Sequence, residues 1–428
     1  MDFNALLGLM VQKNAFDLFI TVDRPPTLKI DQTYVEVSKK SLSKEQTNAL
    51  LMSLLTTRQK EEFFEKKECL FALSIPKIGH FRVSAFIQRD AVGMVLRRIR
   101  EDIPDIGELN LPPIVKKLTM EKHGLVLLAG VLGSGKSNAL ASMIQHRNQN
   151  ANGHVVVLDH PMEFLHSHSK SIITQREIGV DSDSYDFALK NISEQAPDVL
   201  SISELCSAEI IQSVIQLVER GALCISTIRA RNAEHVMERI LNFFPDTMHH
   251  RRIRTEIAMN LTAIISLRVL HSANGQSIRI TEVLLATPSV KEAIRRGEFS
   301  HFHKLISQST HVGMQSFDQS LYHLCLNDKI SYDEALEFAE YKNEFRQIIK
   351  QTPTPESQET NTITADATEG IITTKEISQK KAHRKDSTLE KLENAMFEKV
   401  SPLPDFSGMT LSDVHDENSD AGSIFTRR

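Results

Sequence analysis

The segment that most constrains the fold of this chain is a glycine-rich loop at residues 130–137, GVLGSGKS, which fits the pattern G-x-x-x-x-G-K-[ST]. An apolar run at 124–130 leads into the loop and predicts a buried strand, and a helical pattern at 138–146 follows it. Strand, glycine-rich loop and helix in this order are typical of a phosphate-binding loop. We therefore predict an α/β fold with a phosphate site at the end of this strand.

The residue types in this loop suit the binding of a nucleotide. Its glycines let the backbone turn its N–H groups toward a phosphate, and the following helix N-terminus adds a positive dipole end. The lysine would neutralise the β- and γ-phosphates, and the serine after it would ligate Mg²⁺. A plain glycine-rich turn is the alternative, which the flanking strand and helix disfavour. The loop predicts a nucleotide and Mg²⁺ as ligands, and the candidate binding residues are Gly130, Gly133, Ser134, Gly135, Lys136, Ser137 and Asn138.

A chain of 428 residues is too long for one ordinary domain. Alternating strand patterns at 69–74, 79–88 and 93–99 predict a small α+β domain over 1–105, and prolines mark a linker at 106–113. Strand and helix patterns then alternate, which predicts an α/β domain with a mostly parallel sheet over 114–350. The predicted strands are 124–130, 154–159, 198–203, 222–227, 262–269 and 278–285, and the later helices are 289–296, 316–325 and 332–348.

Residues 351–428 differ from the rest in composition, with few large apolar side chains, and predict a disordered acidic tail. The tail holds 14 acidic and 9 basic residues and so supplies the whole net charge of −5. The remaining chain is close to neutral, which argues against general nucleic-acid binding. No apolar run reaches the length of a membrane span, so we expect no direct membrane insertion. The four cysteines are widely spaced and predict reduced thiols in the cytosol.

Charged residues follow three of the predicted strands. Glu163 comes shortly after strand 154–159, Glu204 directly after strand 198–203, and Arg229 just after strand 222–227. Carboxylates at the strand ends beside a phosphate loop orient Mg²⁺ or polarise the attacking water, and Arg229 stands where a sensor of the γ-phosphate would lie. Each position taken alone is compatible with a solvated sheet edge. Because all three residues follow predicted strands that come after the phosphate loop, the sequence predicts that they belong to one site.

Two further clusters of residues are compatible with a purely structural role as well as with a functional one. The histidines at 154, 160, 166 and 168 lack a second ligand set at zinc spacing, which favours polar loop residues over a metal site. The basic run at 249–254, HHRRIR, is compatible with nucleic acid or anionic lipid. A solvated helix face or a subunit contact is the favoured interpretation of this run.

The sequence resembles the secretion-type ATPases that power retraction of type IV pili, the PilT/PilU group, and most closely its PilU branch. The resemblance extends over about residues 1–350. Besides the loop at 130–137, the matching stretches are FRVSAF at 81–86, GMVLRRI at 93–99, PMEF at 161–164, TQREIG at 174–179, QAPDV at 195–199, RILNFFP at 239–245 and GMQSFDQ at 313–319.

The resemblance implies a PAS-like N-terminal domain joined to a RecA-like ATPase core. It also implies a homo-hexameric ring with ATP between one subunit's core and its neighbour's N-terminal domain. By the same resemblance, Glu163 is the catalytic glutamate, Glu204 is the Walker B glutamate that organises Mg²⁺ with Ser137, and Arg82 and Arg97 reach the nucleotide. The resemblance also implies that the protein is cytoplasmic and peripheral to the inner membrane. The implied partners are a pilus platform protein and an active PilT-type ATPase.

The chain departs from the family pattern at several sensing positions. The acidic box has Asp159 and His160 in place of Glu-Asp, and the sensor loop ends in Arg229 in place of histidine. The remaining departures are Ser201, Ser203, Cys206, Ala222 and Asn138. Because removal of one positioned donor can cost about a hundredfold in rate, these departures predict reduced or partner-dependent hydrolysis.

Three functions follow from these observations. The first is an ATP-hydrolysing motor of pilus retraction and twitching motility. The second is a catalytically weakened nucleotide-binding ring that acts as a structural or regulatory partner of an active retraction ATPase. The third is a DNA translocase, against which the near-neutral core argues.

Overall fold

The strand that leads into the glycine-rich loop, β7 (Gly124–Ala129), is buried along its whole length. It lies inside a seven-stranded sheet of order β13-β12-β7-β11-β10-β8-β9, in which only β13 is antiparallel to its neighbour. Apolar residues fill successive positions of β7 because helices cover both faces of the sheet. The other strands are β8 (Gly153–Asp159), β9 (Ser171–Glu177), β10 (Val199–Ile202), β11 (Leu223–Ile228), β12 (Leu261–His271) and β13 (Ser277–Leu285).

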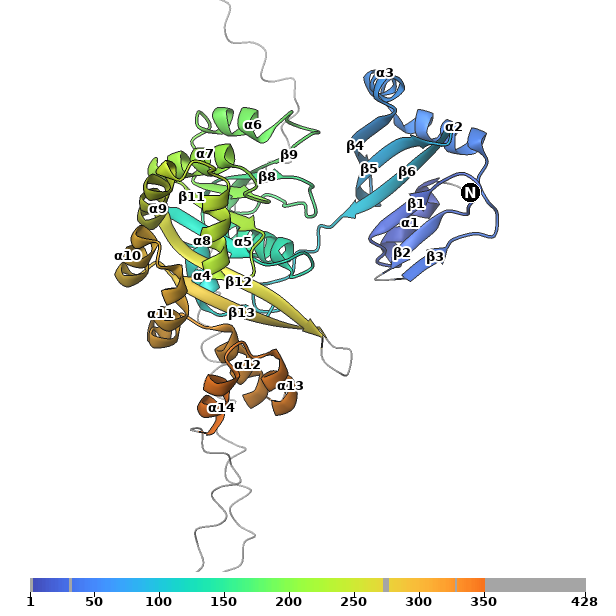
Figure 1. Cartoon of the computed structure of the whole chain (residues 1–428). Helices are drawn as coiled ribbons and strands as arrows, with labels where there is room; N and C mark the ends of the chain where they lie inside the picture. The colour runs from blue at the N-terminus through green and yellow to red at the C-terminus, as the bar shows by residue number, and fades with distance from the viewer. Residues whose placement is uncertain (1–2, 31–32, 272–276, 328, 351–428) are drawn as a thin grey trace, which may run out of the picture. The chain divides into compact units, whose positions relative to one another are not determined.

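These observations come from a computed structural model that describes residues 3–30, 33–271, 277–327 and 329–350 (Figure 1). All of them belong to one compact unit, Met1–Pro353. The predicted tail at 351–428 lies outside the described residues. Within the described part of the chain, no helix is both long and apolar enough to span a bilayer.

Two hydrophobic layers cover the larger sheet. One face packs against α4 (Ile114–Thr119) and α5 (Lys136–Asn150). The predicted linker at 106–113 joins this layer, because Ile106, Leu109 and Leu111 are buried in the same cluster. The opposite face is covered by α6 (Tyr185–Ile192), α7 (Ala208–Glu219), α8 (Ala233–Asn242), α9 (Met248–Asn260), α10 (Pro288–Arg296), the short turn η1 (Phe299–His301) and α11 (Phe302–Gln308).

A second, six-stranded sheet precedes the larger one in the chain. Its order is β3-β2-β1-β6-β5-β4, and every neighbouring pair is antiparallel. Buried and exposed residues alternate along β5, as expected of a sheet with one covered face. The elements are α1 (Phe3–Gln12), β1 (Asp17–Ile20), β2 (Thr27–Ile30), β3 (Thr33–Glu36), α2 (Lys44–Leu54), α3 (Thr57–Lys66), β4 (Glu68–Ile75), β5 (Gly79–Gln88) and β6 (Ala91–Ile99).

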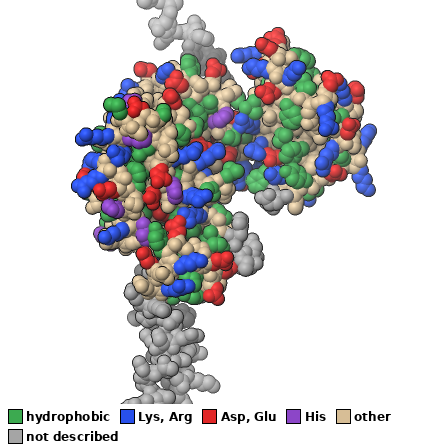
Figure 2. Space-filling view, viewed as in Figure 1, with side chains coloured by type: hydrophobic (Ala, Val, Ile, Leu, Met, Phe, Trp, Pro, Cys, Tyr) green, Lys and Arg blue, Asp and Glu red, His purple; other side chains and the backbone are tan. Residues whose placement is uncertain are grey.

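The C-terminal helices form a small cluster of their own against β13. Buried Phe317, Leu321 and Phe345 pack there around Ile280. The elements that follow α11 are η2 (Thr310–Val312), α12 (Phe317–Leu326), α13 (Tyr332–Phe338) and α14 (Lys342–Lys350). Figure 2 shows one face of the molecule, on which basic and acidic side chains of the described residues are interspersed.

The structure confirms an α/β fold and all six strands predicted for the larger sheet, with shifts of one or two residues at their ends. The strand β9 was not predicted, because this edge strand has one neighbour and its polar residues Thr174 to Arg176 stay partly exposed. The single helix predicted at 332–348 is wrong. It is broken into α13 and α14, because the buried Asp318 carboxylate accepts the backbone N–H groups of Glu340 and Tyr341, both at 2.9 Å. The domain boundaries themselves stay a prediction.

Candidate functional site

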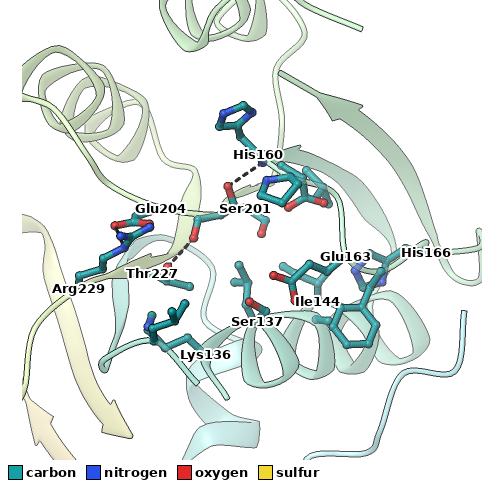
Figure 3. A pocket seen from close by; sticks show the side chains of 18 of the residues that line it. Lys136, Ser137, Ile144, His160, Glu163, His166, Ser201, Glu204, Thr227 and Arg229 are labelled. Carbon is teal, nitrogen blue, oxygen red and sulfur yellow. Dashed lines mark hydrogen bonds and ion pairs between the residues drawn. The ribbon is translucent and has the colours of Figure 1, made fainter. Parts of the chain in front are cut away.

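A pocket of about 270 Å³ lies where the carboxyl ends of β8, β10 and β11 meet the glycine-rich loop. This is the position at which open parallel sheets hold their ligands. Figure 3 shows the polar side chains that converge on it from the separate loops. Its polar lining consists of Arg97, Lys136, Ser137, Asp159, His160, Glu163, His166, Ser201, Ser203, Glu204, Thr227 and Arg229.

The glycine-rich loop has the geometry of a phosphate cradle. Gly133 and Gly135 have φ angles of +80° and +85°, a backbone conformation that residues with a side chain rarely adopt. A Cβ atom on Gly130 would lie 2.2 Å from the hydroxyl of Ser134, so the tight turn requires glycine there too. Gly135 is the N-cap of α5 and makes no side-chain cap, which leaves the first-turn N–H groups of α5 for an anion. The loop therefore fits a bound phosphate chain.

Lys136 folds back over this loop. Its Nζ donates to the carbonyl oxygens of Gly130 at 2.7 Å and Val131 at 2.8 Å. Burial lowers the pKa of the lysine, and the nearby Glu204 carboxylate partly opposes this shift. A phosphate group in the cradle would offer this ammonium stronger acceptors than two backbone carbonyls do.

The loop that carries Glu163 is anchored by Gln175 of β9. The Gln175 Nε2 group donates to Asp159 Oδ2 at 2.8 Å and to the Phe164 carbonyl at 2.7 Å. Its Oε1 accepts the backbone N–H of His166 at 3.1 Å. One amide side chain thus connects the start and the end of the loop, and Glu163 is held between these anchors with its side chain in the pocket lining.

Asp159 contributes a buried carboxyl group to the pocket wall, although the residue as a whole is only half-buried. Burial raises the pKa of this group to about 7, against the opposing hydrogen bond from Gln175. The folded protein therefore binds more protons at this carboxyl than the unfolded chain between about pH 4 and 7, and the stability contributed by the group is lost as pH rises through that window.

Substitution of Asp159 with asparagine tests this carboxyl directly. Asp159→Asn keeps an acceptor for Gln175 and cannot ionise, so it is expected to stabilise the protein at pH 8, on the order of a few kcal/mol, and to have little effect near pH 4. Thermal melting of both proteins from pH 4 to 8 measures the difference. Equal melting temperatures at pH 8 would contradict the assignment.

Glu204 and Arg229 form an ion pair at the ends of β10 and β11. The Arg229 Nε lies 2.8 Å from Glu204 Oε1, and both side chains line the pocket. Ser203 accepts the backbone N–H of His160 at 2.9 Å and shares a hydrogen bond with the Tyr185 hydroxyl at 2.8 Å. Arg229, Ser203 and His160 therefore each bond to a neighbouring part of the same site.

The two arginines predicted from the N-terminal region lie in different surroundings. Arg97 lines the pocket, and its Nε donates to Asp17 at 2.7 Å. Arg82 does not line the pocket and forms an ion pair with the buried Glu177 at 3.1 Å, at the end of β9. The structure thus brings Lys136, Ser137, Glu163, Glu204, Arg229 and Arg97 to one pocket, and it does not bring Arg82 there.

The four clustered histidines bond to protein groups. His154 contacts the Thr174 hydroxyl, His160 the Ile178 carbonyl, His166 the Gln145 amide and His168 the Ile173 N–H. No group of three or more potential ligands within the described ranges is arranged to hold a metal ion. In the basic run, which lies on α9, Arg252 pairs with Glu256 and Arg254 donates to the Arg296 carbonyl.

Sequence reasoning missed Gln175, which anchors the loop that carries Glu163, and Arg100, which contacts the same loop. Gln175 falls within the matched stretch TQREIG, but no local pattern indicates its contacts. Arg100 directly follows the matched stretch GMVLRRI, and no spacing rule connects it to residues more than thirty positions away.

Known proteins resemble this chain over most of its length. A profile of the type II/IV secretion system protein family matches residues 3–393. The chain is 44% identical over 351 residues to the type IV pilus ATPase PilU of Pseudomonas aeruginosa, which covers 82% of this chain and 92% of that protein. It is 28% identical over 345 residues to the type IV pilus retraction ATPase PilT of the same bacterium, over 81% of this chain and 100% of that protein.

A solved structure has the same fold. A crystal structure of the pilus retraction motor PilT with bound ADP superposes with a TM-score of 0.74 at 27% identity and covers 81% of this chain and 99% of that one. The resemblance to the PilT/PilU group is thereby confirmed. Because the family profile spans most of the sequence, the chain belongs to the type II/IV secretion system protein family.

Proposed function

We propose that this chain is a PilU-like motor protein of type IV pilus retraction that binds and hydrolyses ATP with Mg²⁺ and so supports twitching motility. The observation that carries the proposal is the convergence of Lys136, Ser137, Glu163 and Glu204 on one pocket beside a phosphate cradle. The identity to PilU over most of both proteins supports the biological setting.

In this proposal each side chain has a separate task. Lys136 and the N–H groups of the loop hold the β- and γ-phosphates. The hydroxyl of Ser137 and the carboxylate of Glu204 offer the hard oxygen donors that Mg²⁺ prefers, and the ion when bound neutralises phosphate charge. Glu163 orients the attacking water.

We further propose that the core is RecA-like, that the N-terminal region is PAS-like, and that six copies form a ring. Arg97 already lines the pocket of its own chain, and Arg82 is engaged by Glu177. Rotation of one domain against the other on nucleotide turnover would change these contacts and convert chemistry into motion. We place the ring in the cytoplasm at the inner-membrane pilus platform, with an active PilT-type ATPase as a further partner.

A specific observation favours the second candidate, a weakened ring that assists an active retraction ATPase. Arg229 neutralises Glu204, the carboxylate proposed for Mg²⁺. Because Arg229 is largely exposed, the pair is worth no more than about 1 kcal/mol. Arg229→Ala is therefore expected to lower the Mg²⁺ concentration at half-maximal turnover by about two- to fivefold.

The test is ATP hydrolysis by the full chain as a function of Mg²⁺, with nucleotide binding followed in the same samples. Mg²⁺-dependent turnover supports the motor. Binding without turnover, in the wild type and in Arg229→Ala, would support the assisting ring. The absence of binding would reject both functions. An unchanged Mg²⁺ dependence in an active Arg229→Ala variant would contradict the role of the ion pair.

A further inference from the structure

Arg100 contacts two walls of the pocket without being part of its lining. It directly follows β6 and lies between the loop that carries Glu163 and the first turn of α5. We propose that Arg100 is a positioning residue that fixes the Glu163 loop to the first turn of α5, where Ser137 lies. This inference rests on the proposed function, because it concerns the alignment of groups for ATP hydrolysis.

The backbone of Arg100 pairs with the Glu163 loop on both sides of Phe164. The Arg100 N–H donates to the Glu163 carbonyl at 2.9 Å, and the Leu165 N–H donates to the Arg100 carbonyl at 2.8 Å. These bonds form a short parallel bridge between Arg100 and Phe164. The bridge holds the main chain of the loop, and any residue other than proline at position 100 could make it.

The side chain of Arg100 adds two contacts that depend on the guanidinium group. Its central carbon lies 4.3 Å from the centroid of the Phe164 ring, which is the geometry of a cation–π contact. Its Nη2 donates to the Asn138 Oδ1 at 3.0 Å. The flat group can stack on the ring while its edge donates the hydrogen bond, which an ammonium group cannot do as well.

Asn138 gives this contact its importance for the site. It follows Ser137 and lies in the first turn of α5. Its amide oxygen is the acceptor that meets Arg100. The guanidinium thus links the segment of Glu163, which would orient water, to the segment of Ser137, which would hold Mg²⁺. A misalignment of about 1 Å between such groups can cost on the order of a hundredfold in rate.

The test compares Arg100→Ala, Asn138→Ala and the double variant, with Arg98→Ala as the matched control. Arg98 lies near the end of β6, two residues before Arg100, its side chain donates to Asn14 at 3.3 Å, and it does not line the pocket. We expect kcat to fall about tenfold in each single variant, with KM for ATP within about twofold of the wild type. We expect the double variant to lose no more than either single one, because both remove the same contact. Arg100→Lys is expected to recover part of the rate, and Arg98→Ala to match the wild type.

A kcat for Arg100→Ala within about twofold of the wild type, or losses that multiply in the double variant, would overturn the proposal. A wild type that binds nucleotide without turnover would contradict the motor function and leave a separate readout for Arg100. Hydrogen exchange of the peptide that covers 160–166 is then expected to be several-fold faster in Arg100→Ala and Asn138→Ala than in Arg98→Ala. Equal exchange in all three variants would overturn the inference.

Discussion

Lys136→Ala is expected to weaken ATP binding by about a hundredfold or more and to remove hydrolysis with it. The ammonium of Lys136 is half-buried in the cradle, where a charged hydrogen bond to phosphate is stronger than one in water. Alanine leaves the phosphate charge without this partner, and about 2.7 kcal/mol corresponds to a hundredfold in affinity. Titration with a fluorescent ATP analogue measures the loss.

The fold is expected to survive this substitution. In the structure Lys136 bonds to the carbonyl oxygens of buried Gly130 and exposed Val131, so its removal leaves at most one backbone acceptor of a buried residue without this partner. The matched control is Lys122→Ala, because Lys122 is exposed and does not line the pocket. Wild-type affinity in Lys136→Ala, at an unchanged melting temperature, would show that the glycine-rich loop is not the nucleotide site.

Glu163→Gln is expected to lower kcat by about a hundred- to a thousandfold while ATP binding stays within a few-fold of the wild type. The carboxylate lines the pocket from a loop whose main chain is held by Gln175 and Arg100. Glutamine keeps the size and hydrogen bonding of the side chain and loses the negative charge that polarises water, so the loss is expected in the chemical step. Single-turnover hydrolysis with saturating Mg²⁺ separates this step from binding.

The matched control is Glu194→Gln, an exposed residue that follows α6 outside the pocket. A Glu163→Gln variant that hydrolyses ATP at the wild-type rate would assign water activation to another group, and Asp159 is a further carboxyl group in the lining. Loss of both binding and turnover would indicate that the substitution disturbs the loop as a whole. Lys136→Ala and Glu163→Gln together therefore separate nucleotide binding from ATP hydrolysis.

Much of the fold could be predicted from the sequence because its signals are local. The buried strand β7, its glycine turn and the start of α5 follow one another without interruption, so apolar periodicity and φ requirements are enough to predict them. The edge strand β9 was missed because its pattern depends on having one neighbour. The break between α13 and α14 was missed because it depends on the carboxylate of Asp318, which lies on another helix.

The candidate site could likewise be predicted only in part from the sequence. The sequence alone predicts the phosphate loop from its residue types. It also predicts that Glu163, Glu204 and Arg229 share one site, because they follow successive strands and parallel strands bring their carboxyl ends to one edge. The pairing of Arg229 with Glu204, the anchoring of the acidic loop by Gln175 and the bond from Arg100 to Asn138 became known from the folded structure. Arg229 and Glu204 are 25 positions apart in the sequence, and Arg100 and Asn138 are 38 positions apart. Such contacts depend on how loops meet in space, which no local pattern specifies.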